Sequence, residues 1–401
     1  MVPVLKRLLF FTSIQYGCYG LPIDQQATLE TKNLYSNLLK LSRDGSRFVF
    51  GMQGSTQWGE YGGHSPYHVY QNGNTKGWAF TSQQAHDKDN DDLCDVCSIT
   101  NQHPGIMGMD FRDLTPYYLD TVTYLAHKAY ARGEVITFSW HHSNPVTGGK
   151  FYIADDHGDV AHTIQKLLPG GPNNVNLTKN LDKIADWALK FKDPQGKLIP
   201  VIFRPYHEMN GRWFFWGMGN AAHNTPDEYK QLWQFLVRYL RDVKHVHNFL
   251  YAYSPGSVID NHEYMLTYPG DDYVDVLGLD YYYTGSTSRN PTDLIAKIES
   301  VVDVAQRRNK IAAVTEFGSN NPSVDNHPNL WMDLVLKPMK ESKTALGIAY
   351  LSTWINRCSG DRKCGHPYTP YKGHPAADDF LKFFNDPATL WEKNMPNMYS
   401  S

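Results

Sequence analysis

Short apolar strands and amphipathic helices alternate along most of the chain. Eight runs are apolar and rich in β-branched and aromatic residues, the pattern of strands buried on both faces. These runs span residues 48–51, 106–110, 135–140, 201–205, 249–254, 274–281, 311–316 and 346–354. Between most of them, apolar residues recur three and four positions apart, which predicts helices at residues 114–131, 175–191, 227–243 and 292–308. Thr292 is the expected N-cap residue of the last helix.

Eightfold alternation of strand and helix is the pattern of a (β/α)8 barrel. Residues 21–45 are expected to add a helix that closes the floor of the barrel. Long stretches follow three of the strands, at residues 52–104, 141–158 and 209–226. In a barrel, such loops surround the active site at the carboxyl ends of the strands. The chain is therefore predicted to be an α/β protein with a TIM-barrel fold and long βα loops, in a single domain over residues 21–401.

Length and composition agree with one enzyme domain. The chain has 401 residues, which barrels with loop insertions reach as single domains. Its formal net charge is only −3, so neither nucleic acid nor an anionic membrane surface is indicated as a partner. The 26 Tyr, 18 Phe and 10 Trp residues suit a carbohydrate cleft, although ordinary core packing explains most of them. A monomer is expected.

The first twenty residues have the pattern of a secretory signal peptide. Lys6 and Arg7 form a basic segment, residues 8–14 form a short apolar core, and Cys18 and Gly20 are small residues suited to a cleavage site. The apolar run is too short to span a bilayer, and no later segment is better suited. The alternative is a buried amphipathic N-terminal helix. The prediction is a secreted, extracellular protein whose signal occupies residues 1–20.

The remaining cysteines agree with export. Cys94, Cys97, Cys358 and Cys364 predict two disulfides with three possible pairings, and local pairing within each of the two loops is preferred. A four-thiolate zinc site is the alternative, although the second spacing is wide for it. A thioredoxin-like role for the first pair is disfavoured because no helix signal follows it. Asn176, in an Asn-Leu-Thr sequon, is the predicted glycosylation site.

Two of the predicted strands lead into a glutamate. The strand at residues 201–205 continues through Tyr206 and His207 to Glu208, and the strand at residues 311–316 ends on Glu316. Titratable groups at the carboxyl ends of barrel strands commonly perform catalysis, so both glutamates are predicted to be catalytic. Four aromatic residues at 213–216 follow Glu208, as expected beside a sugar ring.

These two segments together resemble glycoside hydrolase family 26. Residues 204–213 read R-P-Y-H-E-M-N-G-R-W, which matches the family pattern R-P-x-H-E-x-N-G-x-W, and residues 315–318 read T-E-F-G. The resemblance implies hydrolysis with retention of configuration, with Glu208 as general acid/base and Glu316 as nucleophile. Burial among His207 and aromatic rings would raise the pKa of Glu208. Hydrogen bonds from a Tyr and an Arg would keep Glu316 ionised.

The resemblance also implies a set of substrate-binding residues. His207 and Trp213 lie in the first motif, and residues 140–145 resemble a family W-H-x-x-N-P segment. Residues 108–110 resemble a G-x-D segment, and the family places a Tyr two residues after an Asp, beside the nucleophile. The predicted substrate-binding residues are His141, His207, Trp213, Tyr282, Trp354, Asp110 and Arg204.

Several of these assignments leave alternatives open. A shift of one residue would make Tyr281, rather than Tyr282, point inward. His142 is expected at the rim of the cleft. Alternation along the strand turns Arg204 into the barrel, where pairing with a carboxylate favours a supporting site role over a purely structural one. The aromatic residues 214–216 are either platforms for neighbouring sugars or loop packing.

The resemblance implies a secreted, retaining endo-β-1,4-mannanase without a cofactor or metal, whose partner is β-mannan, glucomannan or galactomannan. A xylanase or mixed-linkage β-glucanase of the same family is one alternative, and a non-catalytic carbohydrate-binding barrel is another. A metal-dependent hydrolase is a third, suggested by 17 histidines that nevertheless lack paired ligand spacing on a helix.

Overall fold

A closed barrel of eight parallel strands forms the centre of the computed structural model, which describes residues 20–60, 93–257, 260–283, 291–319, 327–356 and 367–401, and the backbone of 67–72 and 75–80. The strands pair in chain order, and the last pairs with the first to close the barrel. They are β1 (Phe48–Gln53), β5 (Ile106–Asp110), β6 (Val135–Trp140), β7 (Val201–Pro205), β8 (Phe249–Tyr253), β9 (Val276–Tyr283), β10 (Ile311–Ser319) and β11 (Tyr350–Thr353). The predicted (β/α)8 barrel is confirmed.

Burial explains why these strands read as continuous apolar runs. Every residue of the eight strands is buried except Tyr282, which is partly exposed near the carboxyl end of β9. Strands covered by helices outside and by side chains inside the barrel need apolar residues on both faces. A partly exposed tyrosine at a strand end therefore indicates the open mouth of the barrel.

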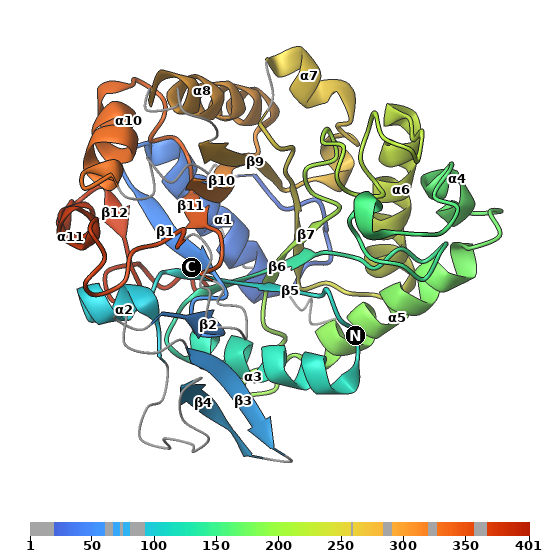
Figure 1. The fold of residues 1–401 in the computed structure, drawn as a ribbon, viewed down its shortest axis with the longest axis horizontal. Helices are drawn as coiled ribbons and strands as arrows, with labels where there is room; N and C mark the ends of the chain where they lie inside the picture. The colour runs from blue at the N-terminus through green and yellow to red at the C-terminus, as the bar shows by residue number, and fades with distance from the viewer. Residues whose placement is uncertain are drawn as a thin grey trace, which may run out of the picture.

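Helices surround the strands (Figure 1). The longer ones are α1 (Leu29–Asp44), α3 (Pro116–Ala131), α5 (Asn174–Lys190), α6 (Pro226–Arg238), which continues as a π-helix over Tyr239–Val243, and α8 (Pro291–Arg308). Thr225 and Glu228 form a capping box at the start of α6. Helix α8 already includes Pro291, so Thr292 lies in its first turn and the predicted N-cap is wrong. Proline is favoured in a first helical turn because its missing N–H needs no partner there.

Helix α1 covers the floor of the barrel, as predicted. Its side chains Leu34 and Leu38 share a buried cluster with the amino-terminal parts of the strands, including Val49, Ile106 and Val135. The carboxyl ends of the strands lie at the opposite end of the barrel and carry the long loops. Across the described ranges, no helix combines the length and the apolar character that a membrane span requires.

The loop after β1 contains structure that periodicity did not predict. Strands β2 (Trp58–Gly59), β3 (Tyr67–Asn72) and β4 (Thr75–Phe80) form an antiparallel sheet, whose hairpin extends from the barrel at the lower edge of Figure 1. Helix α2 (Asp95–Thr100) follows. The tail adds α11 (Ala377–Asn385) and β12 (Thr389–Leu390), which pairs with β1. Shorter elements are α4 (Thr163–Leu167), α7 (Asn261–Leu266), α10 (Lys337–Glu341), η1 (Ile153–Asp155), η3 (Asp271–Tyr273) and η4 (Leu330–Leu336).

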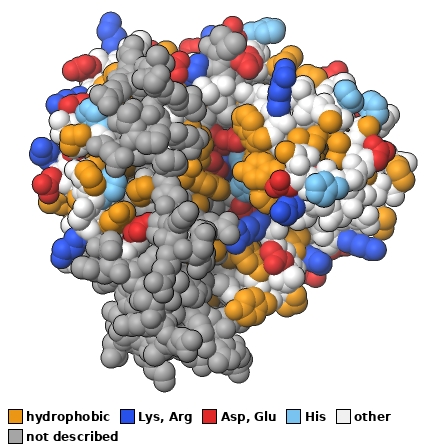
Figure 2. All heavy atoms as spheres, viewed as in Figure 1, with side chains coloured by type: hydrophobic (Ala, Val, Ile, Leu, Met, Phe, Trp, Pro, Cys, Tyr) orange, Lys and Arg blue, Asp and Glu red, His pale blue; other side chains and the backbone are white. Residues whose placement is uncertain are grey.

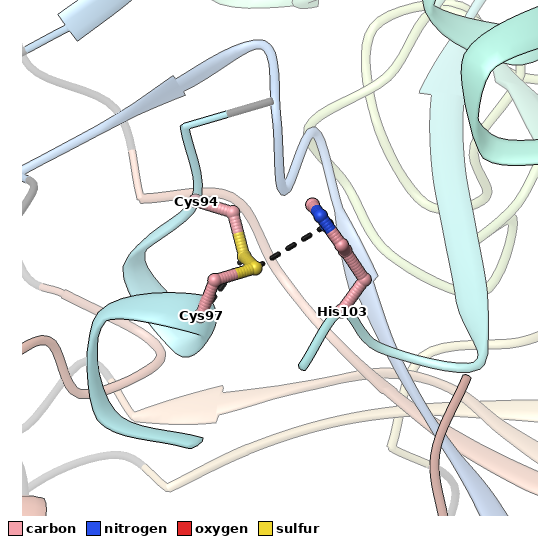
Figure 3. Close-up of side chains that lie close together, drawn as sticks. All are labelled: Cys94, Cys97 and His103. Carbon is pink, nitrogen blue, oxygen red and sulfur yellow. Dashed lines mark hydrogen bonds between the residues drawn. A yellow bond between two sulfur atoms is a disulfide. The ribbon is translucent and has the colours of Figure 1, made fainter. Parts of the chain in front are cut away.

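A disulfide joins Cys94 and Cys97 at the start of α2, as the preferred local pairing predicted. The His103 ring points toward the sulfur of Cys97, with Nδ1 3.2 Å from Sγ (Figure 3). Because both sulfur atoms are bonded to each other, they are not thiolate ligands for zinc. Helix α2 begins directly after Cys94 and contains Cys97, and its six residues are too few to show a periodic helical pattern in the sequence. Cys358, Cys364 and residues 1–19 lie outside the described residues.

Candidate active site

Glu208 and Glu316 lie at the carboxyl-terminal mouth of the barrel. Glu208 follows β7 by three residues, and Glu316 lies in β10, at a register shift between β10 and β9. Both side chains are largely buried, with exposed fractions of 9 % and 4 %. The charge of Glu316 acts on the carboxyl group of Glu208, so two glutamates from distant parts of the chain share one site.

Three side chains surround the carboxylate of Glu316. Arg204 donates a charge-assisted hydrogen bond to Oε1, and Tyr282 donates one of 2.7 Å to Oε2. His207 places Nε2 3.8 Å from Oε1. These contacts fix both oxygens of Glu316 and supply positive charge beside them.

Arg204 joins two carboxylates from neighbouring strands. Its Nη1 donates to Oδ2 of Asp280 at 2.8 Å, while Nη2 donates to Glu316. Burial lowers the pKa of Arg204, but the charges of Asp280 and Glu316 outweigh it and raise that pKa overall. Asp280 also accepts a 2.6 Å hydrogen bond from Thr315. Burial raises the pKa of Asp280 well above its ordinary value, against the opposing charge of Arg204.

Asp280 was not among the predicted site residues. It lies on the same face of β9 as Tyr282, two positions away, and that alternation is the signal that identifies it. Tyr281 points the other way and donates a 3.1 Å hydrogen bond to Asp293. The structure therefore places Tyr282, rather than Tyr281, against the proposed nucleophile.

The carboxyl group of Glu208 has a raised pKa. Burial and the charge of Glu316 raise it from 4.5 to about 7, while a hydrogen bond from Trp213 opposes the rise. The indole nitrogen of Trp213 lies 2.8 Å from Oε2 of Glu208. A carboxyl group that is protonated near neutral pH can act as a general acid, so the environment of Glu208 suits proton donation.

Two predicted histidines lie beside the glutamates, and their surroundings shift their pKa values in opposite directions. His141 bonds through Nδ1 to Oδ2 of Asp110, and its backbone N–H donates to Oδ1 at 3.0 Å. Burial lowers the pKa of His141, but the charge and hydrogen bond of Asp110 reverse this and raise it. Burial and the charge of Arg204 instead lower the pKa of His207 well below its ordinary value. Nδ1 of His207 is buried with no hydrogen-bond partner within the described residues.

A cavity of about 380 Å³ opens beside these residues. Figure 2 shows acidic and histidine side chains in a hollow near the centre of this face, with hydrophobic side chains beside them. Predicted residues Asp110, His141 and Trp354 line the cavity, and its aromatic walls suit stacking against sugar rings. The lining residues that the sequence did not indicate are Gln53, Gln57, Trp58, Arg112, Tyr118, Phe151, Tyr152, Ile355 and Tyr368.

For the neighbouring residues, one expectation is wrong and one open alternative is decided in favour of loop packing. His142 is only 2 % exposed and stacks on Trp140, so it is not a rim residue. Phe214, Phe215 and Trp216 are buried, and Phe214 stacks on Trp216 with ring centroids 4.4 Å apart. They pack the loop after β7 instead of offering exposed platforms. Only Trp213 of this aromatic run is well exposed, at 43 %.

One group of potential metal ligands lies in the site. Ligand atoms of His207, Asp280 and Glu316 lie within 4.8 Å of one another. The guanidinium group of Arg204 bonds to both of these carboxylates and supplies the positive charge that a cation would bring. The geometry thus favours carboxylate catalysis, and the prediction that no cofactor is needed remains a prediction.

The sequence is similar to those of known proteins. A mannan endo-1,4-β-mannosidase of Bifidobacterium adolescentis is 40 % identical over 266 residues, which is 64 % of this chain and 25 % of that protein. One of Bacillus subtilis is 32 % identical over 203 residues, 46 % of this chain and 52 % of that protein. The chain thus spans from a quarter to about half the length of these relatives.

Solved structures and a family model extend the likeness to the whole barrel. A modular endo-β-1,4-mannanase from Cellulomonas fimi superimposes with a TM-score of 0.78 at 31 % identity, over 95 % of this chain and 79 % of that one. The model of glycosyl hydrolase family 26 matches residues 23–341, which include both glutamates and all of the barrel except β11. The chain therefore belongs to glycosyl hydrolase family 26, a family of enzymes that hydrolyse glycosidic bonds.

Proposed function

We propose that the chain is a retaining endo-β-1,4-mannanase in which Glu208 is the general acid/base and Glu316 the nucleophile. One observation carries the proposal: two buried glutamates share the mouth of the barrel in opposite environments. Glu316 is held by Arg204 and Tyr282, whereas Glu208 has a pKa raised to about 7. A pair of carboxyl groups, one charged and one protonated, is what glycoside hydrolysis requires.

In the first step, an oxygen of Glu316 attacks the anomeric carbon while the bond from that carbon to the leaving oxygen breaks. Glu208 transfers its proton to the leaving oxygen, which departs as a hydroxyl group of the released chain. Arg204 and Tyr282 orient Glu316 for this attack, and their hydrogen bonds limit its motion. The product is a glycosyl ester of Glu316.

In the second step, Glu208 acts as a base. It takes a proton from water, whose oxygen attacks the same carbon as the ester bond to Glu316 breaks. Both glutamates return to their starting states, and the sugar is released with its original anomeric configuration. Neutral His207, whose Nε2 lies 3.8 Å from Oε1 of Glu316, stays beside the nucleophile in both steps.

Mannan is the proposed substrate because the two relatives described above are named mannan endo-1,4-β-mannosidases. Reducing-sugar release from mannan, xylan and barley β-glucan discriminates among the activities considered. Mannan should be degraded fastest, and faster release from either other polymer would change the substrate assignment. If Glu208→Ala and Glu316→Ala both match the wild type, the catalytic assignment is wrong.

The stereochemistry tests the mechanism. Proton NMR at the start of hydrolysis should show the β-anomer first, and mass spectrometry after treatment with a 2-deoxy-2-fluoro mannoside should find the label on Glu316. Initial release of the α-anomer would indicate single displacement by water and would remove the nucleophile role of Glu316.

Secretion and a monomeric state belong to the same proposal. The basic and apolar segments within residues 1–20 and the disulfide between Cys94 and Cys97 support an oxidising extracellular destination. N-terminal sequencing of the exported protein should begin near residue 21, and light scattering should give the mass of one chain. An uncleaved, cell-retained protein would contradict secretion. Mass spectrometry of the peptide containing Asn176 tests its glycosylation.

A further inference from the structure

His142 makes an ordered set of contacts away from the cleft. It stacks on Trp140 with ring centroids 3.8 Å apart, and it does not line the cleft cavity, unlike His141. Asn180, on α5, donates from Nδ2 to Nε2 of His142 at 2.9 Å. Burial lowers the pKa of His142 to about 3, so the ring is neutral. Because Nε2 accepts, Nδ1 carries the proton and donates to the hydroxyl of Tyr206 at 3.1 Å.

Tyr206 begins a strained turn that contains the proposed acid/base. Its φ is +47°, and φ of Glu208 is +52°. Residues other than glycine rarely adopt this left-handed backbone conformation, and each one destabilises the folded state by about 1–3 kcal/mol. A backbone of this kind persists only where its surroundings hold it in place.

Hydrogen bonds hold the main chain of this turn. Tyr229 donates to the carbonyl of Tyr206 at 2.9 Å, Trp216 donates to the carbonyl of His207 at 2.7 Å, and the N–H of Glu208 donates to the carbonyl of Ser254 at 2.8 Å. These bonds fix peptide groups but leave the Tyr206 side chain to be fixed separately.

The Tyr206 side chain is fixed from the direction of α5. Its ring is fully buried between Trp140 and Trp216, with centroids 5.4 and 5.5 Å away, and its hydroxyl bonds to His142. Without that bond, the buried hydroxyl of Tyr206 would have lost its hydrogen-bond partner. The strained residue would also have lost the contact that holds its side chain in place. Relaxation of φ at Tyr206 would rotate the following peptides and shift Glu208 relative to the scissile bond.

We propose that Asn180, His142 and Tyr206 are positioning residues that hold Glu208 where it can protonate the leaving oxygen. The inference rests on the proposed function of Glu208. It assigns a catalytic consequence to two consecutive hydrogen bonds that begin on α5, outside the barrel strands, and whose residues do not line the cleft cavity.

Leaving-group dependence tests the inference, because misplacement of a general acid slows reactions that need a proton more than those that do not. His142→Phe keeps a ring on Trp140 but removes both nitrogens, and Asn180→Leu removes the donor to Nε2. Each variant should lower kcat/KM on mannan by about tenfold or more, and by less than about threefold on a 2,4-dinitrophenyl β-mannobioside, whose phenolate leaves without a proton. His142→Gln, which keeps a donor and an acceptor, should restore part of the loss.

Two controls separate the outcomes. Lys179→Leu, at an exposed position of the same helix, should leave both rates unchanged. Glu208→Ala should show the largest difference between the two substrates. Suppose that Glu208→Ala lowers kcat/KM on mannan far more than on the 2,4-dinitrophenyl substrate. If His142→Phe and Asn180→Leu then lower kcat/KM equally on both substrates, or lower only the melting temperature, the positioning role is wrong and the proposed function stands. If Glu208→Ala itself affects the two substrates equally, the proposed function is wrong and this inference is overturned with it.

Discussion

The indole N–H of Trp213 donates a 2.8 Å hydrogen bond to Oε2 of Glu208. The bond connects an exposed rim residue to a carboxyl group that is 9 % exposed. It favours the charged carboxylate and lowers the pKa of Glu208, while burial and Glu316 raise that pKa to about 7. The pKa of Glu208 therefore depends on opposing effects, and a change of Trp213 at the rim can alter it.

Trp213→Phe should shift the alkaline limb of the pH–activity profile to higher pH. A general acid works while protonated, so kcat/KM of the wild type should fall as pH rises through about 7. Loss of the indole donor raises the pKa of Glu208 further and extends activity to higher pH, with a weaker maximum because sugar contact is also lost. Profiles of kcat/KM between pH 4 and 9 test this prediction, and a shift of the alkaline limb to lower pH would contradict it.

Glu208→Gln should be more stable than the wild type at alkaline pH. The pKa of Glu208 rises from 4.5 to about 7 on folding, so the folded protein holds this proton more tightly than the unfolded chain. The resulting stability is full below the unfolded pKa and is lost as pH rises through the folded pKa. Glutamine stays neutral at every pH. The difference in unfolding free energy between variant and wild type should therefore grow between pH 5 and 8 and reach about 3 kcal/mol at most. Urea unfolding measures it, and a difference independent of pH would refute the explanation.

Tyr282→Phe should lower kcat about tenfold to a hundredfold, because it removes a donor to the proposed nucleophile. Tyr281→Phe is a matched control on the same strand, since Tyr281 bonds Asp293 on the outer face. Its kcat should stay within about twofold, with a loss of about 1 kcal/mol in unfolding free energy. Kinetics on mannan and urea unfolding of both variants provide the measurements. Equal effects on kcat would indicate that the inward face of β9 is misassigned.

The double variant Cys94→Ser/Cys97→Ser should weaken substrate binding more than catalysis. The disulfide closes a short loop, so its loss should cost only about 2 kcal/mol of stability. Asp95, next to Cys94, accepts hydrogen bonds from the N–H of Glu60 at 2.8 Å and from Asn356 at 2.9 Å. Asn356 lies two residues after Trp354 in the cleft, so a looser α2 should raise KM for mannan. A loss in kcat with unchanged KM would contradict this link.

Much of the barrel was predictable from local pattern. The strands at residues 106–110, 135–140 and 201–205 have their predicted limits, because burial on both faces requires an unbroken apolar run. Strand β10 extends three residues beyond Glu316, and β11 is shorter than predicted. Strands β2 to β4 were missed, because a loop rich in Gly, His, Asn and Asp has no hydrophobic period to indicate pairing.

The site was predictable where a long motif or a strand end identified its residues, as for Glu208, Glu316 and Arg204. Trp58 and Arg112 were not, because they reach the cleft from loops whose path depends on the rest of the fold. His142 was misjudged for the same reason: neighbouring residues after a strand point in opposite directions, and the environment of the outer one belongs to α5.

The sequence by itself determined the order and type of the barrel elements and the chemical groups at their carboxyl ends, because those depend on the apolar pattern and residue identity at each position. Only the tertiary structure decided which groups meet. Closure of the barrel brings Arg204 of β7 between Asp280 of β9 and Glu316 of β10, and burial raises the pKa of Glu208 to about 7. Distances and solvent exclusion, which set charge pairing and acidity, arise from packing among segments that are remote along the chain.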